Sequence, residues 1–434
     1  MTLLTIGTVI GSGIFLVPGG VLRQVQGSVG LALLVWAGGG VLSLLGALTY
    51  AELGAMRPAS GGLYVYIRDC FGELAAFLFG WTLFFVISTG TVATLAVAFS
   101  TYLQEVLPLA ALARKLVSVG MIVVMTAINV RGTRLSADVT NWSTALKVGA
   151  IVLMSGVLLV LSRGWQSDGP VWPEVMDSSL FSGFGLGMIA VLWAYEGWQY
   201  PTYSAGEIRE PERIFARGLL LGTVALIGIY LLANVAYLAA LGPTEVARSE
   251  SVAAVSLAAV VGPWAAKLVA LAILVSIFSA ANSTALTAPR VFYAMAADGV
   301  FFRALARIHS RFQTPALAIV AGSAWAVVLV LWMEKFEKLL TYVVFIGWTF
   351  YALAAASVFV YRLRQPDLSR PYRVPGYPLT PLLFILASLA VVLNNIWTQP
   401  GDSAKGLAVV LAGLPAYMLW RRANGDKRAG RRTG

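Results

Sequence analysis

The chain has 434 residues, of which 59% are hydrophobic and only 12% are charged, and its mean hydropathy is +0.80. A soluble globular domain carries roughly 25% charged residues. A chain with half that share has too little polar surface to cover a water-soluble particle, so lipid is the solvent it requires. The formal charge of +11 follows from basic loops, and no nucleic-acid partner is expected.

Runs without Asp, Glu, Lys or Arg recur along the chain, and each approaches the roughly 20 residues that a helix needs to cross a bilayer. They are continuously apolar, which favours helices over a β-barrel. Single charges, Lys147 and Glu196, interrupt two of them. The sequence predicts an all-α membrane protein with twelve transmembrane helices, at 1–22, 24–51, 74–104, 116–130, 139–162, 178–206, 218–244, 268–289, 312–333, 339–361, 374–401 and 406–420.

The distribution of Lys and Arg among the loops predicts the orientation. With a cytoplasmic N-terminus, the loops after even-numbered helices and the C-terminal tail hold 21 of the 31 basic residues, and the opposite loops hold 8. Cytoplasmic loops of membrane proteins carry an excess of Lys and Arg. Both termini are therefore predicted to be cytoplasmic, in a multi-pass protein that contacts membrane lipid.

Enzyme, metal and disulfide chemistry find little support in the sequence. The one cysteine, Cys70, lies near a predicted cytoplasmic helix end, so no intramolecular disulfide can form. The one histidine, His309, lies in a loop and leaves no metal cluster. No Ser–His–Asp, HExxH or carboxylate-pair arrangement is present. We expect neither an enzyme nor a cofactor.

The two halves of the chain correspond weakly to each other. The first predicted helix is interrupted by Gly11 to Gly13 and then Pro18, and the sixth by Gly197 and then Pro201. Because an odd number of helices separates the halves, they have opposite topology. Broken helices at matching positions of inverted halves point to a transport site at mid-membrane. We predict one transporter domain, 1–420, with repeats at about 1–163 and 178–364, helices 11 and 12 at about 374–420, and a basic cytoplasmic tail, 421–434, that is disordered.

The first break favours an anion. Gly11 and Gly13 each cost about 1 kcal/mol in a helix relative to alanine, and non-helical backbone at membrane depth persists only where it lines a cavity or meets a ligand. Unwinding exposes the amides of Ser12, Gly13 and Ile14 at the start of a half-helix, where the dipole is positive. The alternative is that the glycines only allow close helix packing.

The second break has the opposite polarity. Around Glu196 and Gly197 the chain offers the carbonyls of Trp193, Ala194 and Glu196 at a negative dipole end. An amino acid zwitterion has one charged group for each break, which favours amino acid binding between them. The candidate substrate-binding residues are Ile10, Gly11, Ser12, Gly13, Ile14, Trp193, Ala194, Glu196 and Gln199.

Several motifs, in this order along the chain, resemble those of the amino acid–polyamine–organocation superfamily. They are GTVIGSGIFLVPG, YAEL, SGG followed by two tyrosines, AYEGW, AGEIREPERIFARGL, YLLANVAY, RVFYAMAADG, TPALAI and RPYRVPGYP, and they run from helix 1 to helix 11. Within the superfamily the sequence is most similar to bacterial L-type amino acid transporters. The resemblance implies a LeuT-like five-plus-five inverted repeat with broken helices 1 and 6, alternating access, and the bacterial inner (plasma) membrane. Because Cys70 lies on the wrong side, no disulfide-linked heavy subunit is expected.

Lys147 is predicted to face the protein interior with acceptors around it, since a lysine at the bilayer centre costs about 2.5–3.5 kcal/mol. Snorkelling to the interface is the alternative. The resemblance places Lys147 where sodium-coupled relatives bind a sodium ion, which implies sodium-independent transport. Asn282 in helix 8 is either a partner for Lys147 or a residue that joins neighbouring helices by hydrogen bonds.

Glu196 could face a cationic substrate group, take part in proton coupling, or cap a neighbouring half-helix. Gln199 is expected to hydrogen-bond locally or through water. The resemblance makes Trp193 the aromatic that closes over substrate, whereas by itself it could be simple packing. It also places Tyr237, with Asn234, near the internal half of the site. Lys147, Trp193, Tyr237 and Asn282 are the coupling and gating candidates.

These observations predict a sodium-independent exchanger or facilitator of small or medium neutral L-amino acids, because Ile14 and Trp193 lie near the site. The alternative, kept open by Glu196, is proton-coupled or exchange transport of cationic amino acids or polyamines. A channel would need a pore lined along its whole length and would lack the doubly gated break. The sequence does not distinguish exchange, facilitated diffusion and proton symport.

Overall fold

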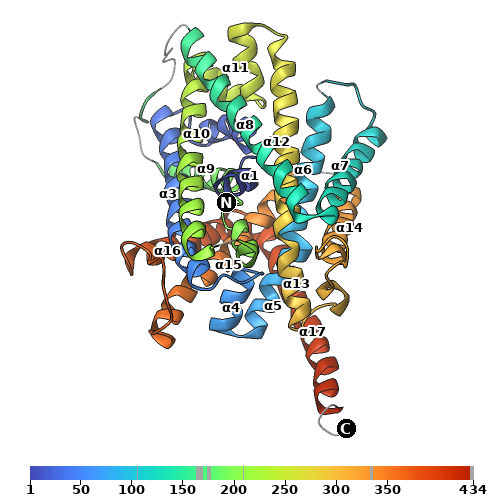
Figure 1. Cartoon of the computed structure of the whole chain (residues 1–434). Helices are drawn as coiled ribbons and strands as arrows, with labels where there is room; N and C mark the ends of the chain where they lie inside the picture. Colours follow the sequence, from blue (N-terminus) through green and yellow to red (C-terminus); the bar gives the residue numbers. More distant parts are fainter. Residues whose placement is uncertain (105, 163–169, 174–176, 209, 333–335, 431–434) are drawn as a thin grey trace.

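The computed structural model describes residues 1–104, 106–162, 170–173, 177–208, 210–332 and 336–430. Within them every regular element is helical, and the helices pack into one bundle, with α11 at one end and α17 projecting from the other (Figure 1). The elements are α1 (Thr2–Val9), α2 (Gly13–Gln24), α3 (Val29–Met56), α4 (Leu63–Phe71), α5 (Glu73–Thr82), the π-helix η1 (Leu83–Ile87), α6 (Ser88–Gln104), α7 (Ala111–Arg131), α8 (Thr133–Leu161), α9 (Ser178–Ala194), the 3-10 helix η2 (Tyr200–Glu207), α10 (Pro211–Arg248), α11 (Val252–Val261), α12 (Ala265–Thr287), α13 (Pro289–Ala297), the 3-10 helix η3 (Arg303–Ala306), α14 (Ala316–Trp332), α15 (Phe336–Arg364), α16 (Leu379–Thr398) and α17 (Pro400–Gly430).

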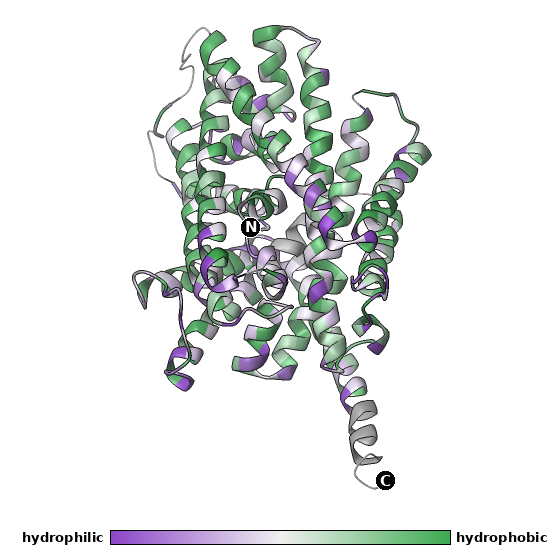
Figure 2. Cartoon of the chain, in the orientation of Figure 1, coloured by the Kyte–Doolittle hydropathy of each residue, from purple (hydrophilic) through white to green (hydrophobic). Residues whose placement is uncertain are grey.

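The helices have the length and composition of membrane spans. Among the described residues, nine helices are long and apolar enough to cross a membrane, and the bent pair of α1 and α2 makes a tenth candidate. Apolar residues run along most of their length (Figure 2). Each of the twelve predicted spans overlaps a helix or the bent pair, although α9 and α14, at 17 residues each, are shorter apolar helices. The all-helical architecture is confirmed.

Burial divides the bundle into a centre and a periphery. The apolar windows of the segments Glu73–Gln104 and Ala265–Ala297 are both 72% buried, whereas those of Ala111–Arg131 and Ser403–Arg421 are only 22% buried. A helix that is apolar on all sides and mostly exposed within the protein must face lipid. The segments that contain α6 and α12 therefore form the core, and α7 and α17 lie at the edge.

A buried carboxylate ties three elements together at the end of α3. Glu52 is 1% exposed and accepts hydrogen bonds from Arg362 Nε (2.9 Å) and Nη2 (2.7 Å) and from the Val374 amide (2.7 Å). Arg362 lies in the last turn of α15, and Val374 precedes α16. The bidentate ion pair with Arg362 and the hydrogen bond from the Val374 amide together compensate the Glu52 charge, which would otherwise be costly to bury.

The C-terminal tail differs from the prediction. The residues after Trp420 were expected to be disordered, but α17 continues as a helix through Gly430. Residues 431–434 lie outside the described part of the chain. The helix continues because Arg421 to Gly430 contain no proline, and an established helix adds residues at little cost.

Candidate substrate site at two helix breaks

The first break lies where the Gly-Ser-Gly sequence predicts it. Helix α1 ends at Val9, α2 begins at Gly13, and the two are bent by 53°. Ile10 has an extended backbone, and Ile10 and Ser12 are 0% exposed. Backbone hydrogen bonding resumes at Phe15, whose amide donates to the Ser12 carbonyl at 3.1 Å. The preceding amides are thus the donors that a helix start leaves without helical partners.

The second break packs directly against the first. Helix α9 ends at Ala194, and a turn with Gly197 at φ +122° leads to η2. A Cβ atom on Gly197 would lie 2.6 Å from the Thr8 carbonyl oxygen, and one on Gly13 would lie 2.7 Å from the Ala194 Cβ. Only glycine permits these close approaches and this backbone conformation. The two breaks therefore form one continuous, buried region.

Side chains from two other helices satisfy the carbonyls of the first break. Lys147, on α8, is 1% exposed, and its amino group donates to the carbonyls of Gly7 (2.9 Å) and Ile10 (2.5 Å). The Ser276 hydroxyl, on α12, donates to the carbonyls of Gly11 (2.9 Å) and Ile10 (3.2 Å). Lys147 therefore points inward to acceptors and does not snorkel. Sequence reasoning missed Ser276, because a serine in an apolar helix more often bonds its own backbone.

Tyr230, on α10, connects the two breaks. Its hydroxyl donates to the Ala194 carbonyl at 2.9 Å and lies 3.5 Å from the Val9 carbonyl oxygen, and its side chain is 0% exposed. Tyr237, which the family resemblance indicated, lies two turns further along the same helix. Tyr237 is buried, and in the described part of the chain its hydroxyl has no hydrogen-bond partner. Nothing in the sequence distinguishes the two tyrosines, since both lie in one apolar helix.

Replacing Tyr230 with phenylalanine is expected to reduce amino acid uptake about two- to tenfold. The variant loses one buried hydrogen bond, worth about 0.5–1.5 kcal/mol. Tyr195→Phe is a matched control, because that buried hydroxyl has no partner among the described residues. Initial uptake rates in proteoliposomes measure the effect. Equal rates for the two variants would contradict the assigned role of Tyr230.

Glu196 lies in a network of three side chains. Its Oε1 atom accepts hydrogen bonds from Gln199 Nε2 and from the Tyr351 hydroxyl, both at 2.5 Å, and the Gln199 and Tyr351 polar atoms are 2.7 Å apart. Glu196 is 8% exposed, and Tyr351, on α15, is fully buried. Sequence reasoning missed Tyr351 because it lies about 150 residues away on another helix. Since the hydrogen bonds found for the Glu196 carboxylate come from side chains and not from backbone amides, they do not support helix capping.

The remaining predicted residues of the site surround these breaks. The Ser12 hydroxyl is buried and has no hydrogen-bond partner among the described residues. Ile14 is fully buried, and the Trp193 ring approaches Gly13, with its Cζ3 atom 3.4 Å from the position of a Cβ there. The Trp193 carbonyl already accepts the Glu196 amide at 3.0 Å. A carbonyl oxygen has two lone pairs, so a second donor can still bind it.

Asn282 hydrogen-bonds side chains of other helices in the described structure, and not Lys147, the partner considered for it from the sequence. Its side-chain amide donates to Ser136 Oγ and Thr140 Oγ1, both at 3.1 Å, and its oxygen accepts from Asn129 at 2.8 Å. These partners lie on α7 and α8, whereas the Lys147 amino group binds the first break. The expectation of a Lys147–Asn282 pair is not supported. Asn282 joins α12 to its neighbours, which is the alternative that the sequence left open.

The far end of the second break is fixed by an ion pair. Arg290, on α13, donates through Nε (2.8 Å) and Nη2 (3.1 Å) to the two carboxylate oxygens of Glu207, and also to the Thr133 hydroxyl (3.1 Å). The Arg290 side chain is 3% exposed and that of Glu207 is 37% exposed. The pair connects η2 to α13 and to the start of α8.

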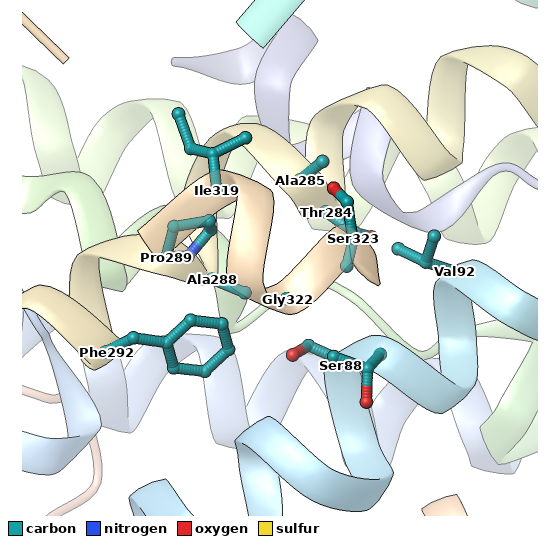
Figure 3. A pocket seen from close by; sticks show the side chains of 11 residues that line it. Ser88, Val92, Thr284, Ala285, Ala288, Pro289, Phe292, Ile319, Gly322 and Ser323 are labelled. Atoms are coloured by element: carbon teal, nitrogen blue, oxygen red, sulfur yellow. The ribbon is translucent and has the colours of Figure 1, made fainter. Parts of the chain in front are cut away.

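The described structure also holds a small cavity away from the breaks. It lies between α6, α12, α13 and α14, has a volume of about 20 Å³, and its wall includes Ser88, Thr284, Phe292 and Ser323 (Figure 3). That volume holds about one water molecule, so it is too small for an amino acid. No group of three or more His, Cys, Asp and Glu residues that could hold a metal occurs among the described residues.

Two adjacent breaks inside a bundle of apolar helices are typical of a membrane carrier. The chain belongs to the amino acid permease family, whose sequence profile matches residues 1–417. The resemblance to the amino acid–polyamine–organocation superfamily is thereby confirmed. The family consists of multi-pass membrane transporters, which supports the prediction of a transporter over an enzyme.

Curated relatives match nearly the whole chain. The serine/threonine exchanger SteT of Bacillus subtilis is 31% identical over 95% of this chain and 94% of its own length. The b(0,+)-type amino acid transporter 1 of Mus musculus is 33% identical over 96% of this chain and 85% of its own length. The human large neutral amino acids transporter small subunit 2 is 32% identical over 95% and 78% of the respective chains. All are named as transporters or exchangers of amino acids.

Proposed function

We propose that the chain is a sodium-independent exchanger or facilitator of small or medium neutral L-amino acids that works by alternating access. The observation that carries this proposal is the contact of two oppositely polarised helix breaks, with Gly13 against Ala194 and Gly197 against Thr8. The amides at the start of α2 suit a substrate carboxylate, and so does the Ser12 hydroxyl, which has no partner among the described residues. The end of α9, with its negative dipole, suits the ammonium group.

Sodium independence is supported by the position of the Lys147 amino group. Unwound carbonyls in transporters of this kind of architecture coordinate a coupling ion. In this chain the carbonyls of Gly7 and Ile10 already receive hydrogen bonds from Lys147. A preference for neutral substrates is supported by Ile14 and Trp193 beside the break, since neither offers a carboxylate to a cationic side chain.

The proposal includes a topology of twelve spans, arranged as two inverted five-helix repeats followed by helices 11 and 12. Among the described residues, each predicted span overlaps a helix or the bent pair of α1 and α2, and ten of these are long and apolar enough to cross a membrane, which supports the number of spans. Both termini are proposed to be cytoplasmic, in a plasma membrane that in bacteria is the inner membrane. With Cys70 buried and no other cysteine in the chain, we propose that no disulfide-linked heavy subunit is needed.

Counterflow in proteoliposomes tests this function. Vesicles are loaded with one unlabelled amino acid and offered a panel of labelled amino acids, with and without sodium or a pH gradient. We expect uptake of neutral amino acids that internal substrate accelerates and that needs neither gradient. Absence of any amino acid or polyamine uptake would overturn the proposal, and sodium-driven uptake into empty vesicles would overturn the role of Lys147.

The second candidate function is proton-coupled or exchange transport of cationic amino acids or polyamines, and the buried Glu196 carboxylate favours it. Under the first proposal, Glu196→Gln keeps exchange of neutral amino acids within about threefold, because the amide oxygen still accepts the two hydrogen bonds. Under proton coupling, the same change abolishes accumulation driven by a pH gradient. The companion is the double variant Glu196→Gln/Gln199→Glu, which moves the acid three residues along the chain.

A further inference from the structure

An apolar groove runs along the outside of the bundle beside the first break. It lies between α8, α11 and α12, which lie side by side in Figure 1, and its volume is about 400 Å³, a size typical of ligand pockets. Apart from Lys147, its wall is made of apolar and aromatic side chains. The lining includes Phe15, Lys147, Ala150, Ile151, Met154 and Ala272.

The mouth of the groove faces the surroundings of the protein. Leu153 is 70% exposed, Trp264 61% and Leu268 52%, and these residues come from both α8 and α12. In a membrane transporter, exposed apolar residues on a spanning helix contact the hydrocarbon of the bilayer. Trp264, at the start of α12, is of the type that anchors a helix at the edge of the bilayer. The medium that reaches the groove is therefore lipid.

The inner wall of the groove contacts the machinery of the site. Its floor includes Phe15, which is 2% exposed and belongs to the first turn of α2, and the hydrocarbon stem of Lys147. The amino group of the same lysine holds the carbonyls of Gly7 and Ile10. Whatever fills the groove packs against the side chain that fixes the first break.

We propose that this groove binds an acyl chain of a membrane phospholipid, which packs against the stem of Lys147. An empty apolar groove would leave its lining without contacts that the surrounding helices cannot supply, and an acyl chain supplies them. The proposal rests on the proposed function only for the importance of Lys147. Binding itself follows from the shape of the groove and from its exposure to lipid.

Photolabelling in proteoliposomes tests the groove. The full chain is reconstituted with phosphatidylcholine that carries a diazirine at the end of one acyl chain, irradiated, and digested with trypsin. Cleavage after lysine and arginine releases peptides 148–163 and 268–290 from the groove and 374–405 from the lipid-facing helix α16. We expect at least threefold more label per exposed apolar residue on the two groove peptides, with adducts at Ile151, Met154 or Ala272.

Filling the groove provides the matched comparison. Ala150→Phe and Ala272→Phe place a ring in the groove and should reduce its labelling at least threefold, whereas Ala390→Phe on the exposed face of α16 should not. Labelling in proportion to exposed area alone, or labelling unchanged by both fillings, would overturn the proposal. Uptake measured in the same vesicles reports separately on transport: a labelled but inactive protein keeps the lipid site and contradicts the proposed function.

Discussion

Replacing Lys147 with alanine is expected to reduce amino acid uptake at least tenfold. The variant leaves the Gly7 carbonyl without its side-chain donor and the Ile10 carbonyl with only the longer bond from Ser276, and a buried carbonyl without a partner costs about 1–3 kcal/mol. A cost of about 1.4 kcal/mol in the binding-competent conformation already lowers its population tenfold. The first break should then rearrange or admit water. Initial rates of substrate exchange in proteoliposomes, normalised to reconstituted protein, measure the effect.

Two further variants make this result specific. Lys267→Ala removes an exposed lysine near the start of α12 and should leave uptake unchanged. Lys147→Met keeps most of the hydrocarbon stem but cannot donate, so it should be as impaired as Lys147→Ala if hydrogen bonding is what matters. Full uptake by Lys147→Met would show that packing of the stem, and not donation to the break, is the contribution of Lys147.

Gly197→Ala is expected to reduce uptake at least tenfold and to lower the thermal unfolding midpoint. The residue has φ +122°, which costs a side-chain-bearing residue about 1–3 kcal/mol. The new methyl group would also lie 2.6 Å from the Thr8 carbonyl oxygen and 2.9 Å from its carbon, which are backbone atoms that cannot rotate away. The two breaks must therefore separate. Exchange rates and thermal unfolding in detergent provide the two measurements.

Gly149→Ala on α8 is the control for this substitution. A Cβ atom at Gly149 would meet no atom within 4 Å, so alanine should be neutral or slightly stabilising because it favours the helix. If Gly197→Ala behaves like Gly149→Ala, the close packing of the breaks does not support transport. If both lose activity, the defect is not specific to the contact between the two breaks.

The parts of the site that follow from local sequence could be predicted. Gly11 to Gly13 cannot form a stable helix, so the first break and its buried amides follow from composition alone. Lys147 was predicted to point inward because a lysine is costly at that depth, with snorkelling as the alternative, and its contacts with the first break support the inward position. The position of Gly197 indicated the second break for the same reason. Each of these inferences needs only one residue and its immediate neighbours.

The partners contributed by distant helices could not be predicted. Ser276 and Tyr230 reach the breaks, and Tyr351 reaches Glu196, only because of how α12, α10 and α15 rotate about their axes in the bundle. That rotation is set by packing between helices that are apolar on every side, so no periodic pattern in the sequence reports it. For the same reason the partners of Asn282 could not be predicted: its amide donates to Ser136 and Thr140, and not to an acceptor near Lys147.

The contact between the breaks has a mechanical consequence. Gly13 lies against Ala194, Gly197 lies against Thr8, and the Tyr230 hydroxyl reaches carbonyls of both segments. A rigid contact of this kind lets neither segment shift alone, because a close-packed interface resists small deformations. The carboxylate and the ammonium group of a substrate would therefore act on one unit, the two packed breaks, which move together. Binding at one break then displaces the other break as well. A molecule that offers only one charged group should therefore be a poor substrate.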